Sequence, residues 1–215
     1  MKKVLIALAL IAASMAPSFA RVSVADLNYG VKVFGNLNTV RGGWSRVVKG
    51  LNNSLSAPGF GVGGFAVLPL PQFVDGLGVR GEFLAQKFSE MFYIDDAYEG
   101  NIRESWNVAE FQIPIMLQYT FPANKLTLMA GPEIGLIFSG NHKLSSKSGT
   151  DKYKIGSDMY NPLQFGIGIG AQYKFLPDVF VDLRYSIGLS NLWRLSSDTK
   201  MGHARCLTLG FGYEF

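Results

Sequence analysis

The sequence has 215 residues, of which 48% are hydrophobic and 13% aromatic, and its formal net charge is +4. No segment after the first 20 residues is apolar over the length of about 20 residues that a membrane-spanning helix needs, and 25 glycines disfavour a mainly helical fold. Lysine and arginine are scattered rather than clustered, which argues against a nucleic-acid-binding protein, and the single cysteine excludes an internal disulfide.

The N-terminal segment has the features of a secretory signal peptide. Two lysines precede an apolar run at residues 4–13, and small residues lead to Ala20. The apolar run is too short to cross a bilayer as a helix. We therefore predict a cleaved signal peptide at residues 1–20 and one exported domain at residues 21–215.

Eight later segments alternate between apolar residues and polar or small residues, which is typical of a β-strand with two unlike faces. The clearest example includes Leu183 and Tyr185, which alternate with Asp182 and Arg184. The first three segments are patterned more weakly. In chain order, the predicted strands are residues 28–37, 60–68, 77–88, 109–121, 126–138, 163–175, 179–189 and 206–215.

The predicted connections between these strands alternate in length. Short turns are expected at residues 69–76, 122–125 and 176–178. Long polar loops are expected at residues 38–57, 93–105, 139–158 and 191–204. Outer membrane barrels have short periplasmic turns and longer extracellular loops. The sequence therefore predicts an all-β, eight-stranded, antiparallel, up-and-down transmembrane β-barrel, integral to the outer membrane of a Gram-negative bacterium, with a periplasmic N-terminus.

Charged residues on the polar faces distinguish this prediction from a soluble β-sandwich or lipocalin-like barrel, both of which bury the apolar face. Side chains fill the lumen of an eight-stranded barrel, which suits small glycines and a plugged, non-conducting interior. Opposite charges there should pair, because an unpaired buried charge is costly. The predicted structural network in the lumen consists of Lys32, Arg80, Glu82, Glu110, Glu133, Asp182, Arg184 and Glu214.

Several segments in the second half of the chain resemble the PorT-like outer-membrane β-barrel family of Bacteroidetes-type bacteria, and the first half resembles it loosely. The segments are residues 111–121, 130–135, 168–175, 181–192 and 209–215. The resemblance implies the barrel fold and the outer-membrane location, and it connects a few members with protein secretion or gliding. It also implies that the terminal aromatics Tyr213 and Phe215 form the signal that the outer-membrane assembly machinery reads.

Two glycine-rich stretches, at residues 61–64 and 166–170, are superficially similar to nucleotide-binding loops. Both fall within predicted strands, whereas such a loop lies between a strand and a helix. We interpret them as small residues that allow close backbone approach in the barrel. Cys206 falls on a lumenal face and is expected to be a small packed side chain.

One enzymatic interpretation exists, an outer-leaflet lipid hydrolase. It rests on two histidines and three serines in the predicted outer loops, and a catalytic triad is recognised by geometry rather than by sequence. These residues are His142, His203, Ser145, Ser146 and Ser148.

The leading functional hypothesis is a non-enzymatic structural or interaction barrel, such as a secretion or assembly accessory, that acts through its outer loops or periplasmic turns. Its expected partners are outer-membrane lipids and lipopolysaccharide, the assembly machinery during biogenesis, and an unidentified protein. No cofactor, metal or nucleic acid is expected. A transporter of small hydrophobic solutes or lipids is an alternative, although charged lumenal faces disfavour it.

Overall fold

The computed structural model describes seven stretches of the chain. They are residues 27–41, 55–96, 100–123, 125–146, 149–154, 161–190 and 203–215. The signal peptide predicted at residues 1–20 lies outside them. Among the described residues, no helix has the length and apolar character that crossing a membrane requires.

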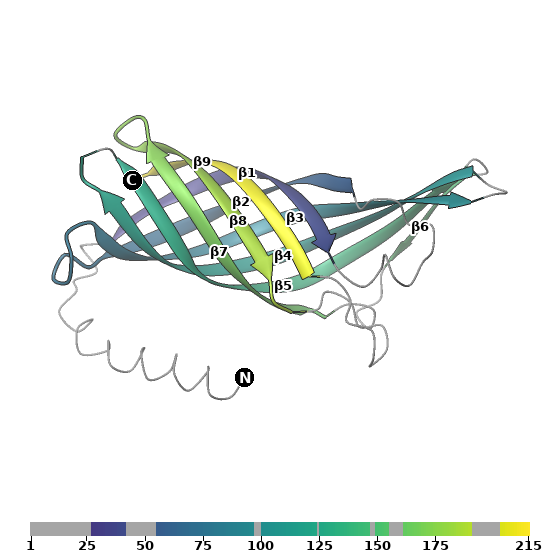
Figure 1. The fold of residues 1–215 in the computed structure, drawn as a ribbon, viewed down its shortest axis with the longest axis horizontal. Helices are drawn as coiled ribbons and strands as arrows, with labels where there is room; N and C mark the ends of the chain where they lie inside the picture. Colours follow the sequence, from purple (N-terminus) through teal and green to yellow (C-terminus); the bar gives the residue numbers. More distant parts are fainter. Residues whose placement is uncertain are drawn as a thin grey trace.

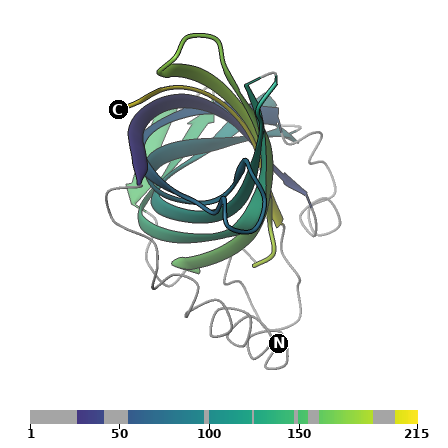
Figure 2. The same cartoon turned by 90° about the vertical axis from the view of Figure 1, so that its left-hand side faces the viewer.

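The described residues form nine strands in one antiparallel sheet. The strands are β1 (Asn28–Arg41), β2 (Leu55–Pro69), β3 (Leu77–Asp96), β4 (Gly100–Phe121), β5 (Leu126–Ser146), β6 (Gly149–Lys154), β7 (Leu163–Lys174), β8 (Val179–Gly188) and β9 (His203–Glu214). Consecutive strands pair around the sheet, and β9 pairs back with β1, so eight strands close into a cylinder. The strands tilt strongly against the cylinder axis (Figure 1), and the ring is visible end-on in Figure 2.

The ninth strand, β6, continues the position of β7 beside β5. β7 pairs with β5 up to Leu136 and Leu163, and β6 pairs with β5 from Asn141 and Lys154 onward. The eight-stranded antiparallel barrel predicted from the sequence is therefore confirmed, with one additional short strand beyond the wall.

Three short connections lie at one end of the cylinder, which we call the turn end. They join β2 to β3, β4 to β5 and β7 to β8, as the sequence predicts, and the C-terminus lies at the same end (Figure 1, left). Gly76 in the first of these turns has a φ of +85°, a conformation that glycine adopts at low cost. The opposite end of the cylinder is called the far end.

Side chains alternate between the lumen and the outer surface along each strand. On β8, Leu183 is 50% exposed whereas Arg184 is 3% exposed. The outer surface is apolar at many such positions on other strands. Exposed or half-exposed aromatics lie near the turn end, where they suit the interface of a bilayer. These aromatics are Tyr29, Tyr119, Phe121, Tyr173, Phe175, Tyr213 and Phe215.

The prediction of long loops at residues 93–105 and 139–158 is wrong, because strands continue through most of both segments. β3 and β4 stay paired from Leu77 opposite Tyr119 to Asp96 opposite Gly100, across most of the expected loop at residues 93–105. β5 and β6 likewise occupy much of the expected loop at residues 139–158. The predicted strands follow apolar alternation, which ends where the wall stops facing lipid, whereas backbone pairing needs no apolar face.

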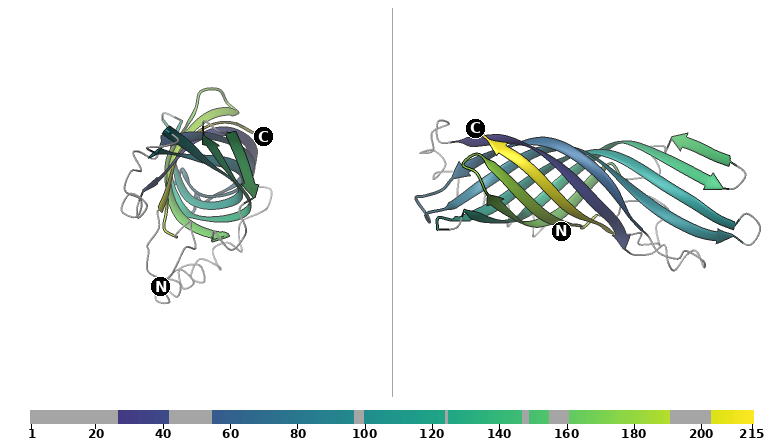
Figure 3. Two further views of the ribbon diagram at one scale, coloured as in Figure 1. Left: turned by 90° about the vertical axis from the view of Figure 1, so that its right-hand side faces the viewer. Right: turned by 90° about the horizontal axis from the view of Figure 1, so that it is seen from above.

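From Met91, the last residue of β3 that pairs with β2, the strands β3 to β6 continue as a projecting four-stranded sheet that we call the wing. It consists of residues 91–96, 100–105, 141–146 and 149–154. Figure 3 shows this projection at the far end in its right-hand view. The other two predicted long loops, at residues 38–57 and 191–204, fall mainly outside the described residues.

Candidate functional site: the lumen of the barrel

The strand period places the charged groups in the lumen. Arg80 and Glu82 are two residues apart on β3, and Asp182 and Arg184 are two apart on β8, so each pair shares the inward face. Lys32 has the same orientation on β1. Because β3 and β8 are separated by β2, β1 and β9 in the sheet, contacts between these residues cross the lumen.

The Glu82 carboxylate is the centre of the network. Arg184 donates to both of its oxygens, through Nη2 at 2.7 Å and Nη1 at 2.9 Å. Arg80 Nε donates at 2.6 Å and Lys32 Nζ lies 3.1 Å away. One carboxylate with three cations and a bidentate arginine is a strong, geometrically specific arrangement. Lys32 Nζ also donates to Asp182 Oδ2 at 3.0 Å, which joins a second carboxylate to the network.

Arg80 is additionally fixed by groups that the sequence patterns did not indicate. Its Nη1 donates to Gln172 Oε1 at 2.6 Å, and its guanidinium lies 3.7 Å from the centroid of the Phe65 ring. Phe65 and Phe180 pack edge to face at 5.5 Å inside the lumen. The alternation of inward and outward positions along β8 could have indicated Phe180. This residue occupies the inward position two residues before Asp182, in a strand whose outward residues are apolar.

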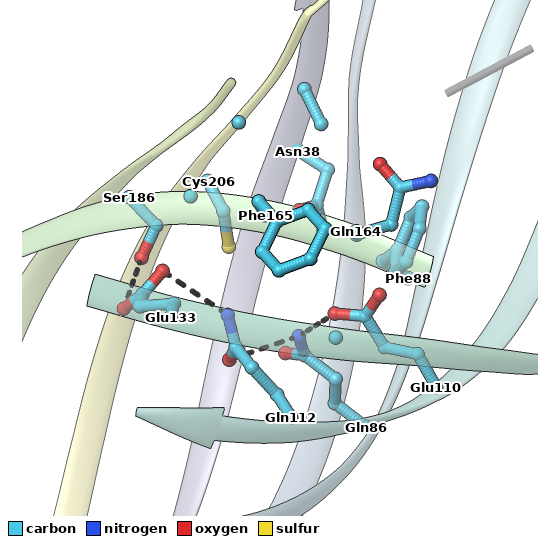
Figure 4. A pocket seen from close by; sticks show the side chains of 14 residues that line it. Asn38, Gln86, Phe88, Glu110, Gln112, Glu133, Gln164, Phe165, Ser186 and Cys206 are labelled. Carbon is cyan, nitrogen blue, oxygen red and sulfur yellow. Dashed lines mark hydrogen bonds between the residues drawn. The ribbon is translucent and has the colours of Figure 1, made fainter. Parts of the chain in front are cut away.

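Toward the far end, carboxylates are held by neutral groups. Glu133 accepts from Ser186 Oγ at 3.0 Å and Gln112 Nε2 at 3.1 Å, and Arg184 Nη1 is 3.9 Å away. Glu110 accepts from Gln86 Nε2 at 2.5 Å. Figure 4 shows these side chains converging from several strands. This half of the lumen is therefore a network of amides and carboxylates.

Two of the residues predicted for the network have other surroundings. Among the described side chains, Glu110 forms no ion pair, although it is 7% exposed. Glu214 pairs with Lys174 at 2.9 Å near the turn end, apart from the Glu82 cluster. The alternation along the strands correctly places Glu110 and Glu214 on the inward face. Their positions along the barrel axis decide which cations they contact.

Lumenal glycines leave the space that the network occupies. A β-carbon at Gly210 would collide with the Asp182 carboxylate, and one at Gly168 would collide with Glu133. This agrees with interpreting the glycine-rich stretch at residues 166–170 as a packing feature. A larger residue at either position would therefore require the neighbouring carboxylate to move.

The network lies between two cavities. The turn-end cavity has a volume of about 370 Å³ and is lined by Arg80, Gln172, Lys174 and Glu214, among others. The far-end cavity is about 60 Å³ and is lined by Glu110, among others. Within the part of the chain that the structure describes, no group of three or more His, Cys, Asp and Glu residues could hold a metal ion.

Four of the five residues of the hydrolase interpretation lie in strands rather than in loops, which corrects the expectation for these four. His142, Ser145 and Ser146 belong to β5, and His203 begins β9. β5 and β9 are separated by β7 and β8 in the sheet, so the two histidines are on non-adjacent strands. Ser148 lies outside the described residues.

Cys206 is half-buried and free, with its Sγ 3.4 Å from Thr208 Oγ1. It also lines the far-end cavity. The expected packed lumenal role is consistent with this placement.

The family model for the outer membrane protein beta-barrel domain matches residues 18–194. The chain belongs to this family. With the closed barrel and its apolar outer surface, this establishes a small integral outer membrane protein.

Solved structures of similar fold include other outer membrane barrels. Ail of Yersinia pestis, in complex with the heparin analogue sucrose octasulfate, is 15% identical, with a TM-score of 0.50 over 88% of this chain and 99% of that chain. Neisserial surface protein A is 11% identical, with a TM-score of 0.48 over 87% and 97%. Identities this low show the fold alone. Comparison with curated protein sequences gives no match.

Proposed function

We propose that this protein is a non-conducting, non-enzymatic barrel that anchors the wing at the cell surface, where the wing binds a partner. The observation that carries the proposal is strand length. β3, β4 and β5 have 20, 22 and 21 residues, whereas β7 and β8 have 12 and 10. A bilayer needs about 10 residues per tilted strand, so the long strands extend well past it.

The wing continues the barrel wall as paired backbone. Six residue pairs join β3 to β4 from Met91 and Ser105 to Asp96 and Gly100, which at about 3.3 Å per residue extends the hairpin by roughly 20 Å. A paired sheet holds its surface with less loss of conformational entropy on binding than an open loop. Because short turns of such barrels are periplasmic, the wing is extracellular in this proposal.

The blocked lumen supports the non-conducting part of the proposal. The Glu82 cluster is almost fully buried and connects opposite sides of an eight-stranded barrel, which is too narrow for an aqueous channel when side chains fill it. A transporter of hydrophobic solutes would need an apolar passage, whereas charged and amide side chains occupy much of the described lumen.

Two finer assignments belong to the same proposal. Membership of the PorT-like group, with a role as a secretion or assembly accessory, is supported by the resemblance of segments such as residues 181–192 and 209–215. Lipopolysaccharide is a further proposed contact of the wing, supported by the exposed Lys143 on β5. Tyr213 and Phe215 are exposed on the last strand and its end, as a recognition signal for the assembly machinery requires.

A shortened wing tests the proposal. Residues 92–104 are replaced by Asn-Gly, so that Met91 and Ser105, which are paired, become the ends of a two-residue hairpin. Intact cells expressing either form are cross-linked, and the barrel is then purified in mild detergent. We expect a defined protein partner with the full wing only, while both forms keep the folded barrel in a heat-modifiability gel.

The matched control changes the opposite end of the barrel. Phe73 and Val74 are exposed in the β2–β3 turn, and their replacement by serine should leave the cross-linked partner unchanged. Equal capture by the shortened and full forms would contradict the role of the wing. Capture that depends on the turn end would move the interaction to the periplasm.

A further inference from the structure

The turn-end cavity has features of a ligand site that do not depend on the wing. It is about 370 Å³, and residues of β1, β2, β3, β4, β5, β7 and β9 line it. Arg80 contributes a charged group that is 1% exposed, and Val67 and Leu77 contribute apolar surface. Most of the lining residues are polar or charged, so a ligand in this cavity would be recognised mainly through hydrogen bonds.

One nitrogen of the Arg80 guanidinium has no hydrogen-bond partner among the described residues. Nε donates to Glu82 and Nη1 to Gln172, and Cζ lies over the Phe65 ring, 3.7 Å from its centroid. Among the described residues, the buried Nη2 has no hydrogen-bond partner. A buried donor on a charged group is unfavourable without an acceptor, and its fixed plane removes the entropy cost of arranging it for a ligand.

A second unpartnered group lines the same cavity. Gln118 Oε1 is buried and has no partner among the described residues. The two ends of a glutamine amide exchange by a half-turn, so Gln118 can also present its NH₂ group to an acceptor. Arg80 on β3 and Gln118 on β4 belong to adjacent strands. Each has a side-chain atom that forms no hydrogen bond with the described residues.

The charges around this cavity are largely paired, which leaves the unpartnered Arg80 donor as the group that favours an anion. Lys174 and Glu214 neutralise each other at the rim, at 2.9 Å. Deeper, three cations contact the Glu82 and Asp182 carboxylates, and Arg184 Nη1 also lies 3.9 Å from Glu133, which accepts from Ser186 and Gln112. Lys125 and Asp75 also line the turn-end cavity. With Glu133 counted, the network is formally neutral, so recognition of an anion rests on the Arg80 Nη2 donor rather than on net charge.

We propose that the turn-end cavity binds a small oxyanion, a carboxylate or a phosphate, on Arg80 Nη2 and the Gln118 amide. Arginine nitrogens match the oxygen spacing of both anions. The volume exceeds that of the anionic group alone, so a short apolar body attached to it fits against Val67 and Leu77. This site belongs to the half of the protein that faces the periplasm by the turn rule.

The test uses the full mature chain in lipid nanodiscs, titrated separately with inorganic phosphate and with acetate at constant ionic strength, with chloride as the reference. Binding is followed by nuclear magnetic resonance of the Gln118 side-chain amide and the Gly78 and Arg80 backbone amides. We expect saturable shifts with at least one of the two anions, and the responding anion identifies the class of ligand.

Three variants decide whether these residues form the site. Arg80→Lys keeps the charge but removes Nη2, and should weaken binding roughly tenfold or more, as expected for a lost hydrogen bond to a charged group. Gln118→Leu should weaken it less, without changing any charge in the network. Gln164→Leu, in the other cavity, should leave it unchanged. If Arg80→Lys does not fold, Gln118→Leu carries the test.

Two results would overturn the proposal. The first is the absence of saturable shifts beyond those of chloride, which would mean that the cavity holds water only. The second is an undiminished affinity for the anion in both single variants, Gln118→Leu and Arg80→Lys. Where Arg80→Lys does not fold, an undiminished affinity in Gln118→Leu is sufficient. Either result leaves the proposed role of the wing unaffected, because that experiment measures a different end of the molecule.

Discussion

The two halves of the lumen bury charge in different ways. Around Glu82, near the turn end, cations and carboxylates contact each other directly at 2.6–3.1 Å. Around Glu110, toward the far end, amides from Gln86 and Gln112 surround the carboxylates. The first half closes the barrel with paired ions, and the second fills it with neutral dipoles.

We expect the buried carboxylates of the two halves to have unequal effects on stability. Removing one partner of a buried ion pair leaves an uncompensated charge and destabilises the fold. Removing a buried carboxylate that has no cationic partner instead removes the desolvation cost of that carboxylate. Glu82 and Glu110 are of the same residue type, both inward-facing and both buried. Their neighbours, rather than their exposure, should decide the outcome of substitution.

The largest effect is expected for Glu82→Gln. This change leaves Lys32, Arg80 and Arg184 without their shared carboxylate and should lower the free energy of unfolding by about 3–5 kcal/mol. Urea unfolding in detergent micelles, followed by tryptophan fluorescence, measures it. A loss below about 1 kcal/mol would show that the cluster contributes little, and the contrast between the two halves would disappear.

A smaller effect is expected for Gly210→Ala. The added β-carbon collides with the Asp182 carboxylate, which Lys32 holds in place, so a loss of about 1–3 kcal/mol is expected from overpacking. The matched variant at the other half is Gly135→Ala, where the β-carbon would lie 3.2 Å from Glu110 Oε2 and 3.3 Å from Gln164 Cβ. Side-by-side unfolding curves should show the smaller loss at Gly135; the reverse order would contradict the tighter packing at Asp182.

The smallest effect is expected for Glu110→Gln. An amide at this position replaces a buried carboxylate that forms no ion pair with the described side chains, so stability should change by less than about 1 kcal/mol or rise. The same unfolding assay, run beside Glu82→Gln, gives the contrast directly. A loss of 3 kcal/mol or more would mean that Glu110 has a cationic partner of its own.

Alternation along the strands predicts which residues face inward, as the exposures of Leu183 and Arg184 illustrate. It does not predict which inward residues meet, because contacts across the lumen depend on strand tilt and stagger. Glu110 and Glu214 share the inward phase with Glu82 but lie at other heights.

The alternation of apolar residues also does not predict the lumenal aromatic residues or the paired strands of the wing. Phe65 and Phe180 are aromatic residues on the inward phase, where they support Arg80, and a pattern of apolar residues outside does not predict them. The wing lacks apolar alternation, so its sequence resembles loops although its backbone is paired as strands.

Planar-bilayer recording of the purified, refolded mature chain tests the central claim most directly, namely that the ion cluster around Glu82 closes the lumen between its two cavities. With the wild-type sequence at neutral pH, we predict no large, stable conductance steps, because the cluster connects strands on opposite sides of the barrel. Large and stable steps would contradict a closed lumen and would identify the protein as a pore.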